Sequence, residues 1–311
     1  MAVEFQVSFP APLDVRASLE LFRRSGDDLI DRWDGQRLVR AVQIGGTWVP
    51  FVAVPNGTVS APSMQVVLDD AAHLAAIRAV AERTFVPAPS AYAELLERDV
   101  VLAELDSRFP GIRQIRQLDL FTALIRCISA QQVNLRWAVT TRRRLAETFG
   151  ERHAVAGHIV YTLSPERIAA VDAAHVRALQ FTTSKSVSIV AVAQALGDAA
   201  FGLESLGELD DDEIIARLVR IRGIGRWSAE WVLARTLGRP RVVAGDLGVR
   251  KAVGLAYRRE SMPSEPEVRE LTAHWGESSS VAQALLLQAL GEGALSAPKP
   301  APPGSRAAPR R

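Results

Sequence analysis

A helical pattern interrupted by glycines, over residues 210–237, constrains the fold more than any other part of this sequence. It starts with the acidic run Asp210-Asp-Asp-Glu213, which has the spacing of a capping box at a helix N-terminus. Apolar residues then recur at helical spacing on both sides of Gly223-Ile224-Gly225: Ile214, Leu218, Ile221, Trp227, Trp231 and Ala234. The pattern predicts two helices joined by a tight, glycine-containing hairpin.

The hairpin has the chemistry of an anion-binding site. Glycine permits backbone angles that other residues avoid and lets a ligand approach closely. The free N–H groups at the start of the second helix favour an anion, and Arg226 lies beside them. Nine basic and two acidic residues fall between Arg217 and Lys251, an excess suited to a polyanion such as DNA. On these residues alone, an ordinary turn between helices and a solvated helix face stay open as alternatives.

Asp246 follows Gly225 by twenty-one residues and comes directly after Val242-Val-Ala-Gly245. This run predicts an extended segment that meets a helix over 246–257, with Asp246 as its N-cap. The first amides of that helix would stabilise an ionised carboxylate. A carboxylate beside a sugar also stabilises the oxocarbenium-like transition state of glycosidic cleavage. A cap without any chemical role and a catalytic carboxylate are both compatible with the pattern.

The N-terminal part, residues 1–87, predicts a mixed α/β domain. Its apolar patterns indicate strands over 3–9, 37–44, 48–54 and 64–68, and helices over 15–24 and 69–85. Gly45-Gly46 between two of the strands is a hairpin signal. Pro87-Ala-Pro89 then marks a domain boundary.

Helical patterns dominate residues 88–295, which we expect to form the second domain. The predicted helices are 91–106, 118–130, 132–149, 164–171, 173–179, 185–196, 210–221, 227–237, 246–257, 265–274 and 279–290. Residues 296–311 are rich in proline and alanine and contain four basic but no acidic residues, so we expect a disordered basic tail.

Composition limits the accompanying chemistry. Cys127 is the sole cysteine, so neither an intrachain disulfide nor a four-cysteine iron–sulfur cluster can form. The five histidines have no metal-ligand spacing, and we expect neither a metal nor another cofactor. The sequence lacks both a long apolar run and a basic signal-peptide start, which predicts a cytoplasmic bacterial protein without a membrane partner. We expect it to act as a monomer.

The run Leu218–Trp231 followed by Gly245-Asp246 resembles the helix-hairpin-helix (HhH-GPD) DNA glycosylase superfamily. Within it, the chain is similar to the bacterial alkylbase glycosylases of the DNA-3-methyladenine glycosylase II family. The resemblance covers about residues 1–290, including 121–134 and 162–195. It implies an α+β fold, with an N-terminal α/β domain like the TATA-binding protein and a mostly helical, two-lobed glycosylase core. It also implies that Asp246 is the catalytic aspartate.

The resemblance assigns further residues to DNA. Gly223, Gly225 and Arg226 match the hairpin that grips phosphate. Gln131 and Gln132 match the segment that contacts DNA, and Gln132 stands where a wedge side chain fills the gap left by a flipped base.

The resemblance also assigns a base pocket, lined by aromatic residues at the positions of Phe22, Trp227 and Trp231. It implies hydrolysis of the N-glycosidic bond of alkylated purines, such as 3-methyladenine and 7-methylguanine, in double-stranded DNA during base excision repair. Such bases carry positive charge, so aromatic faces attract them and no general acid is required. Bifunctional members have a Schiff-base lysine where Trp227 stands, so we expect a monofunctional enzyme without lyase activity.

Three departures from the family pattern leave the lesion range open. Gln132 replaces an aliphatic wedge, and Ser278–Ser280 stands in place of an aromatic-Pro-x-Arg pattern. A further pocket tryptophan of the family is replaced near Leu287. Two alternative functions are an HhH glycosylase for oxidised, deaminated or mismatched bases, and a noncatalytic HhH protein that binds damaged DNA. A two-metal nuclease is not expected, because no group of carboxylates in the sequence suggests a two-metal site.

Overall fold

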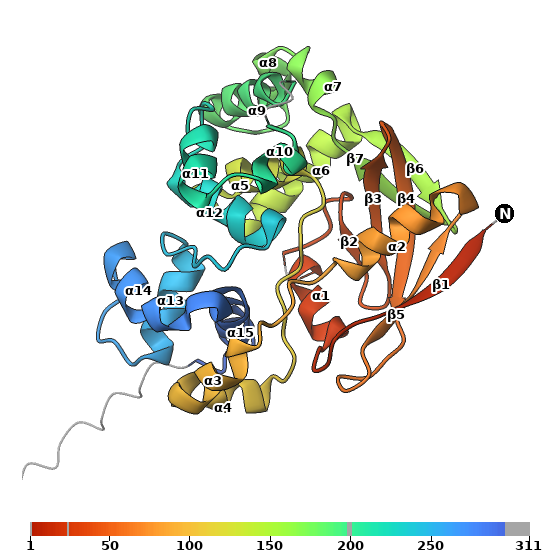
Figure 1. Cartoon of the computed structure of the whole chain (residues 1–311). Helices are drawn as coiled ribbons and strands as arrows, with labels where there is room; N and C mark the ends of the chain where they lie inside the picture. The colour runs from red at the N-terminus through yellow and green to blue at the C-terminus, as the bar shows by residue number, and fades with distance from the viewer. Residues whose placement is uncertain (1, 24, 198–200, 296–311) are drawn as a thin grey trace, which may run out of the picture.

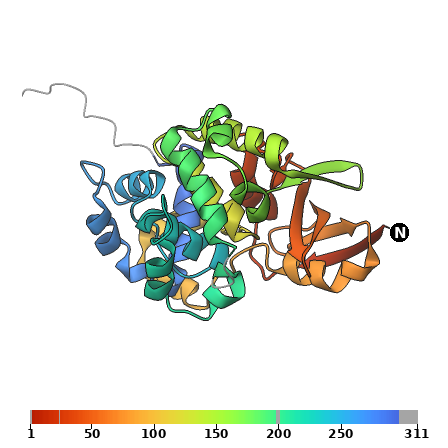
Figure 2. The same ribbon diagram turned by 90° about the horizontal axis from the view of Figure 1, so that it is seen from above.

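The computed structural model describes residues 2–23, 25–197 and 201–295, with the side chains of residues 21–23 excluded. Three main hydrophobic cores organise these residues: one under a β-sheet and two within helical lobes. Figure 1 shows the sheet on one side of the molecule and the two lobes on the other, and Figure 2 shows the same separation from above. No helix in the described ranges is long and apolar enough to cross a membrane. The predicted tail, 296–311, lies outside the described residues.

The sheet is antiparallel and five-stranded in the described residues, with the order β1-β5-β4-β3-β2. Its strands are β1 (Val3–Ser8), β2 (Arg32–Trp33), β3 (Leu38–Ile44), β4 (Thr47–Pro55) and β5 (Ser63–Leu68). The predicted Gly45-Gly46 hairpin is confirmed: both glycines have positive φ, 56° and 83°, as a two-residue turn requires. Helices α1 (Val15–Arg23) and α2 (Leu74–Glu82) contribute Leu19, Ile77 and Ala81 to the core on one face of the sheet.

The opposite face of the sheet is covered by a hairpin that the sequence analysis missed. Strands β6 (Glu151–Val155) and β7 (His158–Thr162) lie between the predicted helices 132–149 and 164–171, in a stretch for which the sequence analysis predicted no strand. Val155 and Val160 pack against Val39 and Val52 of the sheet. Local signals for this hairpin exist, in the β-branched and aromatic residues Ile159–Thr162 and in the two-residue turn Ala156-Gly157, where both residues have positive φ. The strands are short, and the apolar surface that they cover lies more than a hundred residues earlier in the chain.

The first helical lobe is built from the middle of the chain. Its helices share one core, and they are α5 (Leu120–Ala130), α6 (Leu135–Phe149), α7 (Pro165–Ala169), α8 (Ala173–Ala178), α9 (Thr183–Ala195), α10 (Leu203–Gly207), α11 (Asp211–Leu218) and α12 (Arg226–Val232). A π-helical segment, Leu233–Leu237, continues α12 and ends at Gly238, whose φ of 71° provides a left-handed cap.

The second lobe joins helices from both ends of the helical region. It contains α3 (Ala91–Arg98), α4 (Val100–Arg108), α13 (Leu247–Ala256), α14 (Glu265–Leu271) and α15 (Ser279–Gly291). The single helix predicted over 91–106 is broken at Asp99, which has extended backbone and caps α4 by accepting from the Leu102 N–H. The same carboxylate accepts hydrogen bonds from the Tyr257 hydroxyl and, at 2.8 Å, from His274 Nε2. Burial acts to raise the pKa of Asp99, but these hydrogen bonds outweigh it and hold that pKa below its ordinary value.

The chain passes from the first lobe to the second through residues 238–246. The site predicted from the sequence lies at both ends of this crossing, because α12 belongs to one lobe and α13 to the other.

Candidate functional site

The predicted hairpin is present between α11 and α12. Asp210 and Glu213 form the capping box expected at the start of α11. Gly223 has a φ of 88°, and a Cβ placed on it would lie 2.1 Å from the Oγ of Ser188 on α9. Gly225 is the N-cap of α12, has an ordinary φ of −102°, and has open space where a Cβ would be. Close packing therefore requires glycine at 223, whereas at 225 the absence of a side chain leaves the helix N-terminus uncovered.

Asp246 is the N-cap of α13, as predicted, and its carboxylate is held at both oxygens. Oδ1 accepts from the Val249 N–H at 3.1 Å, which is the capping bond. Oδ2 accepts from Nε1–H of Trp227 at 3.2 Å. The side chain is half-buried, and Leu247 beside it is 65% exposed. The carboxylate is thus oriented by one bond from each lobe, at a residue that is itself partly exposed.

Trp227 and Trp231 are one helical turn apart, and Arg235 follows one turn later. The guanidinium of Arg235 lies 5.1 Å from the centroid of the Trp231 ring. Burial lowers the pKa of Arg235, and the negative charge of Asp246 acts in the opposite direction. The sequence analysis did not select Arg235, although its spacing from the two tryptophans places it on the same helix face.

Leu287 lies beside the catalytic candidate. A Cβ placed on Gly248 would be 3.1 Å from Asp246 Oδ1 and 3.4 Å from Leu287 Cδ2. Leu287 therefore supplies an aliphatic wall at this point of the site. Cys127 is buried nearby on α5, and burial raises the pKa of its thiol, so it does not offer a thiolate nucleophile.

Arg226 is exposed over 56% of its side chain, but its Nε also donates to Glu230 Oε1 at 3.0 Å. Glu230 is 1% exposed and is bound by Arg269 of α14 as well, at 2.8 Å. Glu265 completes this cluster through Arg269 and lies beside Gly245, where a Cβ would be 3.1 Å from its Oε2. The sequence analysis missed this cluster, because its members come together only when α14 packs beside α12.

The two glutamines lie at the end of α5. Gln131 Nε2 donates to the carbonyl oxygen of Gly223 at 3.1 Å, so this side chain braces the hairpin. Gln132 is exposed and has a φ of 54°, an unusual conformation for a residue other than glycine. Phe22, predicted to line the base pocket, lies in α1, and its side chain falls outside the described part of the structure.

The helical core of the chain is similar in sequence to a known protein family. The sequence profile of the HhH-GPD superfamily of base excision DNA repair proteins matches residues 125–278, which include the hairpin, both glutamines and Asp246. The chain belongs to the HhH-GPD superfamily.

Relatives of this HhH-GPD chain carry names from DNA repair. It is 28% identical to a DNA-3-methyladenine glycosylase of Bacillus subtilis over 64% of this chain and 66% of that protein. It is 30% identical to a probable bifunctional transcriptional activator/DNA repair enzyme AlkA of Mycobacterium tuberculosis, over 60% of this chain and 36% of that protein. The chain thus spans slightly less than two thirds of the first protein and about a third of the second.

The fold of this HhH-GPD chain is shared with a 3-methyladenine DNA glycosylase from Archaeoglobus fulgidus. The TM-score is 0.79 at 22% identity, over 93% of this chain and 98% of the other. The likeness includes the N-terminal sheet as well as the helical lobes, since so much of both chains is covered.

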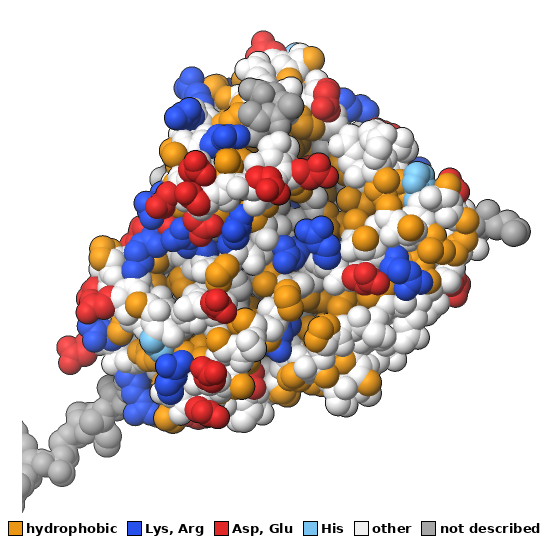
Figure 3. All heavy atoms as spheres, in the orientation of Figure 1, with side chains coloured by type: hydrophobic (Ala, Val, Ile, Leu, Met, Phe, Trp, Pro, Cys, Tyr) orange, Lys and Arg blue, Asp and Glu red, His pale blue; other side chains and the backbone are white. Residues whose placement is uncertain are grey.

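Basic side chains gather on the face that carries the hairpin. Figure 3 shows a band of Lys and Arg side chains across the middle of this face, between the positions of α11 and α13 in Figure 1, with acidic side chains above it near α11. A band of positive charge on this face suits a polyanion.

Proposed function

We propose that this protein is a monofunctional DNA glycosylase of the DNA-3-methyladenine glycosylase II type. It hydrolyses the N-glycosidic bond of alkylated purines in double-stranded DNA, and Asp246 is the catalytic carboxylate. The observation that carries the proposal is the position of Asp246, which is held between the Val249 N–H and Trp227 Nε1 beside the glycine hairpin. The names of the relatives support the substrate class.

The proposed reaction breaks the bond between C1′ and the base nitrogen. The bonding electron pair leaves with the base, which an alkyl group has already made cationic, so the base departs neutral. The sugar develops oxocarbenium character, and the carboxylate of Asp246 stabilises this positive charge. Water then adds to C1′ and gives up a proton, leaving an abasic site. A fixed carboxylate favours the reaction because it needs no reorientation as the charge develops.

The two lysines within the described residues fit hydrolysis by water. A lyase mechanism requires a lysine amine at the sugar, and Trp227 stands where the family's bifunctional members have it. Lys185 Nζ is bound to the carbonyl oxygen of Ser129, and Lys251 is exposed on α13. We therefore expect an intact abasic strand as the product.

In the proposed complex the hairpin binds a DNA phosphate through the N–H groups beside Gly225 and the exposed part of Arg226. Gln132 fills the gap in the base stack, and the extruded base enters a pocket bordered by Phe22, Trp227 and Trp231. We further propose that residues 1–87 form a domain like the TATA-binding protein and that residues 88–295 form the glycosylase core.

The decisive experiment compares the wild type with Asp246→Asn. Asparagine is a good N-cap, so the variant keeps the capping bond but lacks the negative charge. We expect release of 3-methyladenine and 7-methylguanine from methylated DNA, measured by mass spectrometry under single-turnover conditions, to fall at least about 10²-fold while DNA binding is retained. Asp172→Asn, which alters the N-cap of α8 away from the site, is the matched control and should retain full activity.

Two outcomes would refute the proposal. Full base release by Asp246→Asn would exclude the proposed role of the carboxylate. Tight binding of damaged duplex by the wild type without release of any base would instead identify a noncatalytic damage-binding protein. Duplexes with single oxidised, deaminated and alkylated bases separate the proposed substrate class from that of other HhH glycosylases.

A further inference from the structure

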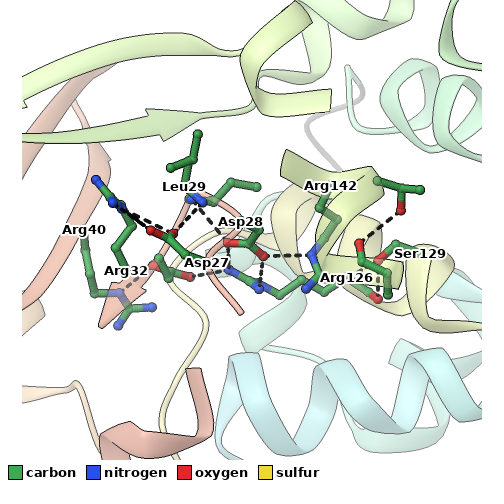
Figure 4. A network of polar contacts seen from close by, with 12 residues as sticks. Asp27, Asp28, Leu29, Arg32, Arg40, Arg126, Ser129 and Arg142 are labelled. Atoms are coloured by element: carbon green, nitrogen blue, oxygen red, sulfur yellow. Dashed lines mark hydrogen bonds and ion pairs between the residues drawn. The ribbon is translucent and has the colours of Figure 1, made fainter. Parts of the chain in front are cut away.

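A buried chain of ion pairs connects the N-terminal part of the protein to the last turn of α5 (Figure 4). Asp28 is 3% exposed, and its Oδ2 accepts from Arg126 at 2.7 Å and from Arg142 at 2.8 Å. Arg142, on α6, also donates through Nη1 to the Oγ of Ser129 at 2.8 Å. Arg126 reaches on to Asp31, so the chain extends toward the sheet. None of these groups takes part in the proposed chemistry.

Ser129 is held from three directions. Its hydroxyl accepts from Arg142 and donates to the carbonyl oxygen of Arg126 at 2.9 Å. Its own carbonyl oxygen accepts from Lys185 Nζ at 2.9 Å, and Lys185 lies on α9. Ser129 is the last residue but one of α5, so these contacts fix the backbone just before Gln131 and Gln132, the glutamine segment.

The glutamine segment is also held on its far side. Gln131 donates to the carbonyl oxygen of Gly223, and Gly223 packs against Ser188 on α9, one turn after Lys185. The end of α5, the start of α9 and the hairpin therefore form one connected unit. Gln132 leaves this unit in the left-handed region, a conformation that persists for such a residue only when its surroundings impose it.

We propose that Arg142 and Ser129 are positioning residues for base extrusion. The chain from Asp28 through Arg142 to Ser129 holds the end of α5 in place so that Gln132 projects into the gap left by the flipped base. The inference rests on the proposed function, because it needs Gln132 to enter DNA. Its consequence is specific: loss of the chain impairs activity where a paired base must be pushed out, and spares activity where the base is already unpaired.

The test uses Arg142→Lys. Lysine keeps a positive charge for Asp28, but its single ammonium lacks the fork that allows arginine to bind Asp28 and Ser129 together. Two duplexes are compared under single-turnover conditions: 7-methylguanine opposite cytosine, and 7-methylguanine opposite an abasic-site analogue. We expect release from the paired duplex to fall about tenfold, the effect of one lost hydrogen bond to a charged group, and release from the unpaired duplex to stay within about twofold.

The ratio of the two rates is the deciding measurement, because it is insensitive to a loss of folded protein. Arg143→Lys is the matched control: Arg143 is the next residue of α6, its partner Glu147 is exposed, and its ratio should equal that of the wild type. Ser129→Ala removes the hydroxyl with little change in volume and should shift the ratio in the same direction as Arg142→Lys. Gln132→Ala should do the same, and adding it to Arg142→Lys should give little further loss.

A ratio that is unchanged in both Arg142→Lys and Ser129→Ala would overturn the inference. This holds whether neither rate falls or both rates fall equally, the second result indicating a purely structural role. These results leave the proposed function standing as long as the wild type releases 7-methylguanine. If the wild type releases no 7-methylguanine from either duplex, the proposed function fails and the inference fails with it.

Discussion

Replacing Trp227 with phenylalanine tests how much the orientation of Asp246 contributes to the proposed reaction. The substitution keeps an aromatic ring at the site but removes the Nε1–H that donates to Asp246 Oδ2 at 3.2 Å. The capping bond from Val249 remains, so the carboxylate keeps one of its two anchors and gains freedom to rotate. We therefore expect Trp227→Phe to fold normally and to bind DNA as the wild type does.

The magnitude follows from the geometry. A hydrogen bond to a charged group contributes about 1.5–3 kcal/mol, and a distance of 3.2 Å places this one at the low end. If the whole contribution is lost in the transition state, about 1.5 kcal/mol corresponds to a decrease of about tenfold in rate. The single-turnover rate of 7-methylguanine release at saturating enzyme measures this decrease separately from binding.

Trp231→Phe is the control, since it makes the same change one helical turn away. The Trp231 ring is covered on one face by Arg235. Its substitution should alter the affinity for the damaged duplex more than the rate of the chemical step. An unchanged or increased rate for Trp227→Phe would refute the view that this indole orients the carboxylate, and equal rate losses in both variants would assign the effect to general packing of the aromatic wall.

Two predictions concern stability. Gly223→Ala places a Cβ 2.1 Å from Ser188 Oγ at a residue with positive φ, so its free energy of unfolding should fall by about 2–4 kcal/mol in denaturant titrations. Gly225→Ala should lose less than about 1 kcal/mol, because a Cβ at this position meets open space. Similar losses in the two variants would contradict the packing argument. The pKa of Asp99 is lower in the folded than in the unfolded protein, so its ionised carboxylate stabilises the fold above the unfolded-state pKa of about 4. This stabilisation is lost as the pH falls through the folded-state pKa. The stability difference between wild type and Asp99→Asn should therefore shrink between about pH 6 and pH 3. A constant difference over that range would refute the assignment.

Local sequence patterns predicted most helices and strands, and also the hairpin and the helix N-cap that carry the candidate site. The capping box of Asp210, the hairpin at Gly223 and the cap at Asp246 all depend on residues within four positions of one another, and the structure contains each of them. The β6–β7 hairpin has local signals that were missed, and its packing contacts with Val39 and Val52 lie beyond the reach of any local pattern.

The same limit explains the missed side chains. Arg142 and Asp28 are 114 residues apart, and neither residue type suggests burial until a partner of opposite charge is known to lie beside it. Arg269 reaches Glu230 from another helix, 39 residues away. Sequence reasoning identified residues that define local backbone geometry, and it missed residues whose role depends on a partner from another element.

The bond between Trp227 and Asp246 joins the two lobes, because α12 packs in the first core and α13 in the second. A hydrogen bond of 3.2 Å is lost when its atoms separate by a further 0.5–1 Å or so, so the orientation of the carboxylate depends on the placement of the lobes.

The crossing segment between the lobes is held to both. Arg239 donates to the carbonyl oxygen of Gly207 at 2.8 Å in the first lobe, and its own carbonyl oxygen accepts from Ser280 Oγ at 2.9 Å in the second. Ser280 belongs to the serine run that departs from the family pattern. In this chain a serine hydroxyl therefore helps to set the distance between the lobes on which the orientation of Asp246 depends, and this gives the departure a physical role in the site.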